Sequence, residues 1–183
     1  MSEGGEGGDA NGEDPDATPS IAARDDLAGV VDLFGALTRE ELSDALSELA
    51  FKARAEVDDD AIAAAIDAGL AEYYLVEAPD AMVSGGETTA NGTTYLAVGP
   101  AAFPSLPPNA EDLPHILDVG DRTVDREAVA ERVLDRLREE ADAAVAAGET
   151  ERMEDLLDVT YDVELWAPVD AAAVQETLHD ALE

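Results

Sequence analysis

The chain lacks cysteine and is poor in lysine and aromatic residues, and each shortage narrows the classes of protein that fit it. Without cysteine, the sequence excludes disulfide bonds, thiol catalysis and cysteine-ligated zinc sites. Of its 183 residues only 10 are basic, and Lys52 is the single lysine. Aromatic residues make up 4% of the sequence, so a core must be built mainly from aliphatic side chains. No apolar run approaches the roughly 18 residues of a transmembrane helix, so we expect no membrane span.

Acidic residues dominate the charge: 44 Asp and Glu give a formal net charge of -34. In a chain this short, such charge would normally predict disorder, because like charges oppose compaction. Hydrophobic residues nevertheless make up 46% of the sequence and recur periodically, which predicts a buried core. The acidic, lysine-poor and Ala- and Val-rich composition resembles that of cytoplasmic proteins of halophilic archaea. The resemblance implies that the acidity is an adaptation to salt and says little about partners.

Residues 1–22 predict a disordered acidic tail. Up to Ser20 this segment holds six acidic residues, five glycines and no base, and its few apolar residues show no helical or strand period. It also lacks the positive region and apolar stretch of a signal peptide, so we expect a cytoplasmic protein.

Three helices are predicted in the first part of a domain that spans residues 23–100. The first helix has apolar residues at the i, i+3, i+4 and i+7 spacing of one helix face: Leu27, Val30, Val31 and Phe34. Thr38 and Glu41 form the capping-box pattern that starts a second helix. Asp58 is placed to cap a third helix, and Gly69 to end it in the left-handed conformation.

Two strands are predicted after these helices, in residues 70–79 and 93–100, with Gly and Asn-Gly turn signals between them. The order of three helices, a strand, a long turn and a strand in residues 25–100 resembles a winged helix-turn-helix domain. It is similar to the small winged-helix proteins of haloarchaea whose role is unassigned. The resemblance implies an α+β, mostly α fold with three helices and a β-hairpin, followed by a helical C-terminal region.

A Pro-rich linker is predicted over residues 101–122, because five prolines from Pro100 onward disfavour helices and strands. We expect this linker to pack on the N-terminal domain through Phe103, Leu106 and Leu113.

Residues 123–183 predict the helical C-terminal region. Within it, residues 150–166 fit either a helix or an alternating strand. We predict a short helix to about Leu157 and then an extended segment to Trp166, because β-branched residues gather in the second half. A last helix is expected to follow, capped by Asp170.

The long helix over residues 123–147, which Gly148 should end, carries a candidate interaction surface. Arg132 and Arg136 border its apolar stripe, and six of the ten bases lie in residues 122–152. The candidate interaction residues are Val129, Arg132, Val133, Arg136, Leu137 and Ala141. Such a stripe suits pairing with a partner helix or with a second copy of the chain. The competing interpretation is that the chain covers the stripe itself, with the arginines paired to nearby acids.

No catalytic, cofactor-binding or metal-binding residue is indicated. Acidic residues are so numerous that pairs occur at every spacing by chance, and none marks a general acid and base. His115, expected to be half-buried in the linker, and His179, expected on an exposed helix face, are in no metal-ligand spacing. No phosphate loop, dinucleotide fingerprint or nucleophile elbow is present. We therefore expect a non-enzymatic protein without a cofactor.

The stretch DDDAIAAAIDAGLAEYYLV, residues 58–76, weakens a DNA-reading role. It has the layout of a recognition helix followed by a wing strand, but holds five acidic residues and no base. Contacts between basic side chains and DNA phosphates contribute less affinity as the salt concentration rises. In a halophilic protein, the absence of basic residues is therefore weaker evidence against DNA binding. We interpret the chain as a protein-interaction or regulatory module. A DNA-binding transcriptional regulator adapted to high salt is the first alternative, and a small hydrolase or ligand sensor the second.

The composition predicts that folding depends on salt. At about 3 M KCl the Debye length falls below about 3 Å, so surface carboxylates hardly repel one another. Diluting the salt to about 0.1 M should therefore abolish the cooperative thermal transition, as followed by near-UV circular dichroism. An identical transition at both salt concentrations would contradict this prediction.

Overall fold

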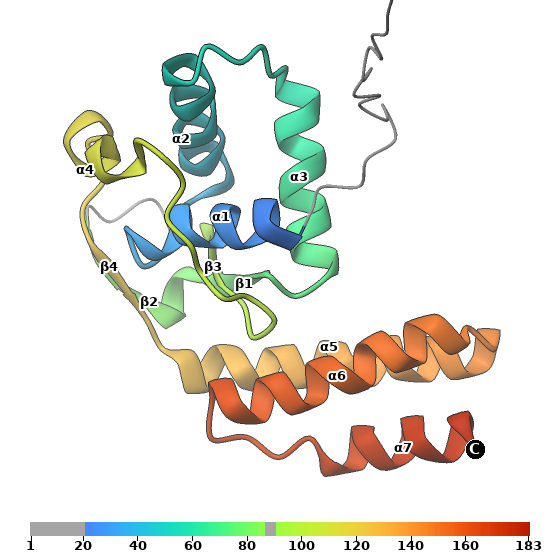
Figure 1. Ribbon diagram of the computed structural model, residues 1–183. Coiled ribbons are helices and arrows are strands. Elements are labelled where there is room, and N and C mark those ends of the chain that lie inside the picture. The colour runs from blue at the N-terminus through green and yellow to red at the C-terminus, as the bar shows by residue number, and fades with distance from the viewer. Residues whose placement is uncertain (1–20, 87–90) are drawn as a thin grey trace, which may run out of the picture.

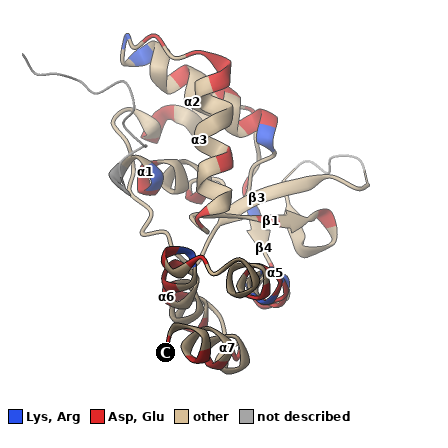
Figure 2. Ribbon diagram, turned by 90° about the vertical axis from the view of Figure 1, so that its right-hand side faces the viewer, with Lys and Arg blue, Asp and Glu red and all other residues tan. Residues whose placement is uncertain are grey.

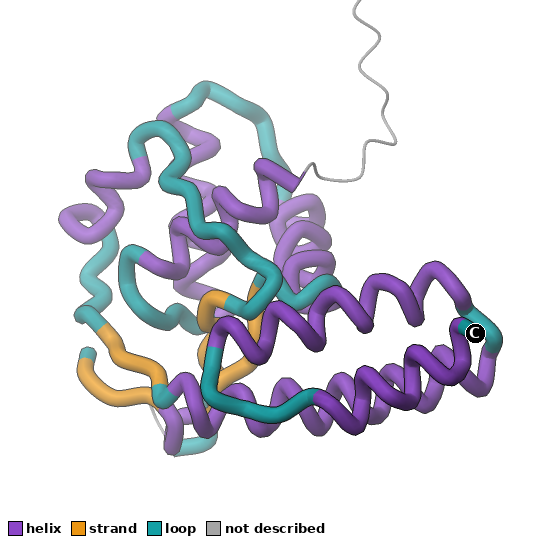
Figure 3. The backbone as a smooth tube through the Cα atoms, turned by 60° about the horizontal axis from the view of Figure 1, so that its bottom comes forward, coloured by secondary structure: helices purple, strands orange, loops and turns teal. Residues whose placement is uncertain are grey.

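The computed structural model describes residues 21–86 and 91–183, which form an α+β arrangement dominated by helices (Figures 1 and 3). The predicted tail, residues 1–22, lies outside the described residues except for its last two. The N-terminal half contains three helices and a hairpin. Its main elements are α1 (Ile21–Asp32), α2 (Arg39–Lys52), α3 (Asp59–Ala71), β1 (Leu75–Pro79) and β3 (Thr94–Val98).

The helix starts follow the predicted caps. The Thr38 hydroxyl accepts a hydrogen bond from the Glu41 amide at 3.2 Å, and the Glu41 carboxylate accepts one from the Thr38 amide at 2.7 Å. Asp58 likewise accepts a hydrogen bond from the Ala61 amide at 2.7 Å. These side chains bind amides that have no partner inside the helix, so the capping box and the third cap are confirmed.

The predicted end of the third helix is wrong. Helix α3 continues through Gly69 to Ala71, and Tyr73 adopts the left-handed conformation with φ of 62°. Gly69 is retained for packing, because an added Cβ would lie 3.0 Å from a methyl carbon of Leu27 and 3.4 Å from the Leu75 side chain.

The β1–β3 hairpin is buried on both faces. The strands are antiparallel, and Leu75 and Leu96 pack into the core formed by the three N-terminal helices. Residues on the opposite face belong to the core formed with the C-terminal helices: Val76, Ala78, Tyr95 and Ala97. The outer edge of β3 pairs with Leu37, which exchanges two backbone hydrogen bonds with Leu96 at 3.0 and 2.7 Å. The hairpin is therefore a wall shared by two cores.

The segment that joins the two hairpin strands makes a second sheet. Within it, η1 (Asp80–Met82) leads into β2 (Val83–Gly85), which pairs antiparallel with β4 (Arg122–Val124). Strand β4 lies directly before the C-terminal helices, so this pairing attaches the hairpin connection to them (Figure 1).

The predicted linker contains two short helices, η2 (Ala110–Asp112) and α4 (Leu113–Ile116). Leu113 is buried as expected. Phe103 and Leu106 are 79% and 50% exposed, so the expectation that they pack on the domain is wrong. His115 is exposed rather than half-buried, because the short helix turns it outward from buried Leu113.

Three helices form a layer beneath the hairpin in Figure 1: α5 (Arg126–Ala147), α6 (Thr150–Trp166) and α7 (Ala172–Leu182). Gly148 ends α5 with φ of 70°, as predicted. The long helix starts at Arg126 rather than at residue 123, because β4 precedes it and Asp125 accepts a hydrogen bond from the Ala128 amide at 3.1 Å. Asp170 accepts a hydrogen bond from the Ala172 amide at 2.9 Å at the start of α7.

The extended segment predicted before Trp166 is wrong, since α6 is one continuous helix. Its buried residues recur at helical spacing: Met153, Leu156, Val159, Thr160 and Val163. Packing of this face against α5 and α7 outweighs the weak strand preference of the β-branched residues.

One buried ion pair fastens β4 to the start of α2. The Arg122 guanidinium donates to both carboxylate oxygens of Glu41, at 2.7 and 2.9 Å, and to the carbonyl of Ala36 at 3.1 Å. It also lies 4.8 Å from the ring centroid of Tyr95. Burial raises the pKa of Glu41, but hydrogen bonds from Arg122 and Thr38 outweigh it and leave the pKa below its ordinary value of 4.5.

We expect Glu41→Gln to lower the free energy of unfolding at pH 7 by about 3 kcal/mol, because it leaves the buried Arg122 charge without its counterion. A carboxyl whose pKa is depressed on folding stabilises the protein above its unfolded pKa and loses this contribution as pH falls through the folded value. The difference between wild type and variant should therefore shrink below pH 4.5. Urea titrations in concentrated KCl measure both effects. Asp67→Asn, which removes the exposed partner of Arg39, is the control and should cost less than about 1 kcal/mol.

Candidate functional site

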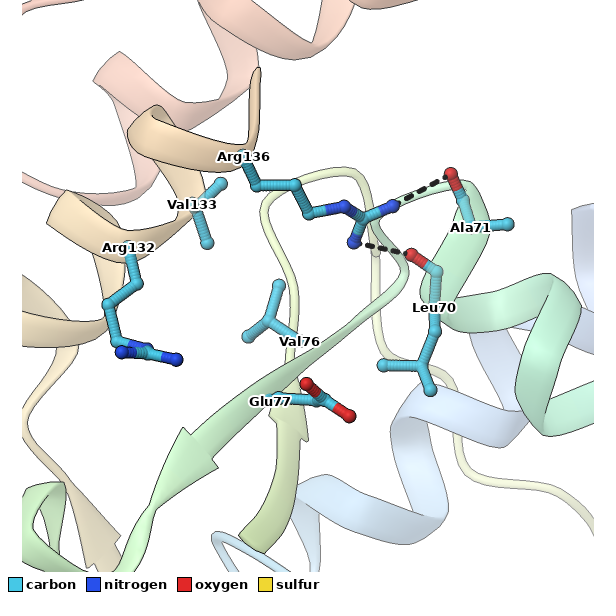
Figure 4. Close-up of a pocket in the computed structure, with 7 residues that line it drawn as sticks. All are labelled: Leu70, Ala71, Val76, Glu77, Arg132, Val133 and Arg136. Carbon is cyan, nitrogen blue, oxygen red and sulfur yellow. Dashed lines mark hydrogen bonds between the residues drawn. The ribbon is translucent and has the colours of Figure 1, made fainter. Parts of the chain in front are cut away.

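A pocket of about 320 Å³ lies where the end of α3, strand β1 and helix α5 meet (Figure 4). We call it the β1-edge pocket. It is lined by Leu70, Ala71, Val76, Glu77, Arg132, Val133 and Arg136. Its volume falls in the range of known ligand sites.

The pocket lies at the edge of β1 that does not pair with β3. Val76 and Glu77 are consecutive strand residues, so their side chains point to opposite faces of the hairpin. Val76 packs into the C-terminal core, whereas Glu77 is on the face of Leu75 and is exposed. A space that both residues line must therefore border the strand edge between the two faces.

Arg136 holds one wall of the pocket in place. Its Nη1 and Nη2 atoms donate to the carbonyls of Leu70 at 2.8 Å and Ala71 at 3.3 Å (Figure 4). These carbonyls belong to the last turn of α3, beyond the reach of the amides inside the helix, and the Leu70 carbonyl also accepts a long hydrogen bond of 3.4 Å from the Tyr73 amide. The Arg136 Nε atom donates to Glu140 at 2.6 Å. All three guanidinium nitrogens of Arg136 thus donate hydrogen bonds: two join α5 to α3, and the third lies within α5.

Tyr73 also contributes to the attachment of α5 to α3. The Arg136 guanidinium lies 4.0 Å from the Tyr73 ring centroid, a favourable cation–π distance. Arg152 of α6 pairs with Glu140 and also donates to the Ala71 carbonyl at 3.4 Å. Burial raises the pKa of Tyr73 well above its ordinary value, so the phenol stays neutral at any physiological pH.

Arg132 differs from Arg136, because it has no hydrogen-bond or ion-pair partner among the residues that the structure describes. It is exposed and extends from α5 beside the open space bordered by Val76 (Figure 4). Asp and Glu residues recur along the helices in Figure 2, and seven ion pairs engage other bases of the described chain. An arginine left unpaired beside a pocket in this setting is available to an anionic ligand.

The residues predicted on the long helix divide into two groups. Arg132, Val133 and Arg136 line the pocket. The rest of the set lies in the core, buried against the neighbouring C-terminal helices: Val129, Leu137 and Ala141. The chain thus covers most of the stripe itself, which was the competing interpretation. Three of the six candidate interaction residues are therefore not exposed to a partner, whereas Arg132, Val133 and Arg136 border the pocket.

The sequence does not predict the N-terminal side of the pocket, namely Leu70, Ala71, Val76 and Glu77. None of these residues forms a motif with Arg132. They meet it only because the hairpin packs against α5, and no local sequence pattern reports that contact.

The outward face of α3 carries acidic side chains. Asp59, Asp60 and Asp67 are exposed, and the helix contains no base. Of the three nearby bases, Arg39 and Lys52 pair with Asp67 at 2.6 Å and with Asp112 at 3.4 Å, and Arg54 is exposed. This face therefore offers phosphate groups little attraction.

No group of three or more histidine and acidic residues within the described ranges is arranged to hold a metal ion. His179 lies exposed on α7, as predicted, with Nε2 3.2 Å from the Tyr161 hydroxyl. None of the described helices is long and apolar enough to cross a membrane.

The chain belongs to a family of unknown function, DUF7109, whose model matches residues 25–183. The match includes both halves of the described structure and every residue of the β1-edge pocket. Comparisons with curated proteins and with solved structures found no match.

The two arginines of the pocket should respond differently to substitution. Arg136→Met removes two bonds to the end of α3 and a cation–π contact, and should lower the free energy of unfolding by about 2 kcal/mol. Arg132→Met removes no hydrogen bond or ion pair of the described residues and should change the free energy of unfolding by less than about 0.5 kcal/mol. Urea titrations in concentrated KCl decide this. An equal loss for both variants would show that Arg132 also has a structural role.

Proposed function

We propose that the chain is a non-enzymatic, halophilic and cytoplasmic protein that acts through a protein partner bound at the β1-edge pocket. The observation that carries this proposal is the unpaired Arg132 beside an apolar recess on an open strand edge. A guanidinium stays protonated under all physiological conditions, so it serves binding rather than proton transfer.

We further propose that the N-terminal half is a module of the winged-helix type. Support comes from the order α1, Leu37, α2, α3, β1 and β3, and from the position of Leu37 on the outer edge of β3. This gives the spatial order Leu37–β3–β1, in which the hairpin follows the third helix as a wing does. Within the connection between β1 and β3, strand β2 pairs with β4, which attaches this part of the wing to the segment before α5.

DNA regulation is the second candidate, and it rests on this arrangement of elements alone. The charge of α3 weighs against it. A reading helix presents its first turns to bases and phosphates, and here those turns carry Asp59 and Asp60. Arg132 lies on another element and borders a recess, which suits a protruding segment better than a broad duplex.

The proposal can be tested by crosslinking from a single introduced cysteine, because the chain has none of its own. Glu77→Cys, modified with a benzophenone maleimide, places the crosslinker at the pocket mouth. In a high-salt extract of the source organism, we expect it to capture one protein upon irradiation. Glu176→Cys on the exposed side of α7 is the matched control and should not capture it.

A second variant tests whether Arg132 contributes to binding of the partner. Arg132→Gln, introduced together with Glu77→Cys, should reduce the yield of that crosslink several-fold. Nuclease treatment of the extract should leave the yield unchanged. Loss of the crosslink after nuclease treatment would favour DNA regulation, and equal capture from both cysteine positions would contradict a partner site at the pocket.

A further inference from the structure

We propose that the occupant of the β1-edge pocket is a short extended segment of an acidic partner protein, added to β1 as an extra strand with a carboxylate on Arg132. This inference rests on the proposed function and specifies the chemistry of the partner. The inference is based on the unpaired backbone groups of β1 and not on the volume of the pocket.

The register of the hairpin shows which backbone groups of β1 are open. Gly99 donates to the Tyr74 carbonyl at 2.9 Å, and Asp80 donates to the Thr93 carbonyl at 3.0 Å. In an antiparallel pair, hydrogen-bonded positions alternate with positions whose groups point outward. Glu77 therefore directs its amide and carbonyl away from β3.

Leu96, the residue opposite Glu77, gives independent support for this assignment. Its amide and carbonyl are both bonded to Leu37 on the far side, at 2.7 and 3.0 Å, so they are not available to Glu77. No other described residue forms a hydrogen bond with the Glu77 backbone. An added strand would satisfy both groups, which is how extended peptides bind sheet edges.

The strand edge also limits how far such pairing can extend. Pro79, two residues after Glu77, has no amide to donate. Prolines of this kind protect open edges from indiscriminate pairing. The pocket therefore fits a few extended residues centred on Glu77, with an apolar side chain beside Val76 and Val133.

Arg132 selects the charge of the segment. Its guanidinium has no acidic partner among the described residues, and a carboxylate on the added strand can reach it in direct contact. Concentrated salt weakens attraction across distances beyond the Debye length of about 3 Å, but charge-assisted hydrogen bonds act at contact distance. Specificity for an acidic segment can therefore persist in molar KCl.

A second copy of the chain does not fit this site through the same surface. The unpaired edge of β1 lies between the end of α3 and helix α5, and residues of both helices line the pocket beside it. Two copies would therefore have to bring these helices together before their β1 edges could pair. A two-fold symmetric contact requires a surface that complements itself. The occupant must protrude, as an extended segment does.

The test uses a defined probe, the blocked pentapeptide Ac-Ala-Val-Asp-Val-Ala-NH2, and the full chain labelled with ¹⁵N in concentrated KCl. We expect saturating peptide to slow hydrogen exchange of the Glu77 amide at least about tenfold and to shift the Arg132 Nε resonance. The Asn version of the peptide should bind about tenfold more weakly, the size of one charge-assisted hydrogen bond. Arg132→Gln, which should fold normally, should remove the difference between the two peptides.

Three results would overturn the inference: no binding at millimolar peptide, binding that leaves exchange of the Glu77 amide unchanged, or equal affinity for the Asp and Asn peptides. Butanoate is the small-anion control, and affinity equal to that of the Asp peptide would assign the pocket to a small organic acid instead. If the crosslinker captures a protein while the peptide fails, the proposed function stands and the strand inference falls. If both fail, the proposed function falls too.

Discussion

The β1–β3 hairpin is the constraint on which the rest of the structure depends, because each of its faces completes a different core. Leu75 and Leu96 close the N-terminal core, while Val76 and Tyr95 enter the C-terminal one. A shift of one residue in strand register would exchange these faces and disrupt both cores at once. The arrangement leaves one exposed residue, Glu77, within β1, and it is at Glu77 that the strand edge borders the pocket.

Two arginines connect the elements around the β1–β3 hairpin. Each binds charged or polar groups that packing alone would leave without a hydrogen-bond partner. Arg122 binds Glu41 across the start of α2, and Arg136 binds the carbonyls at the end of α3. A planar guanidinium can satisfy two acceptors and cover an aromatic ring at the same time, which an ammonium group cannot do. The near-absence of lysine is therefore compatible with a well-connected interior.

Local features of this fold were predictable from the sequence, and features that depend on distant contacts were not. Thr38, Glu41 and Asp58 cap helices through residues three positions away, so their patterns are visible in a short window. The helical state of residues 158–166 depends on α5 and α7, and local β-branched content pointed the wrong way. The pocket combines residues more than 50 positions apart. The position of Arg132 and Arg136 beside an apolar stripe marks them as candidates in the sequence, whereas no comparable pattern marks Glu77.

The Arg122–Glu41 pair joins residues 81 positions apart, and this separation has a consequence for synthesis of the protein. Residues of α2, α3 and the hairpin are synthesised before Arg122, so Glu41 must wait for its counterion. The hairpin face that bears Val76 and Tyr95 waits longer still, until α5 and α6 emerge to cover it. Contacts of such long range slow folding and expose apolar surface in the interval. The nascent N-terminal half therefore reaches its final state only after most of the polypeptide has been translated.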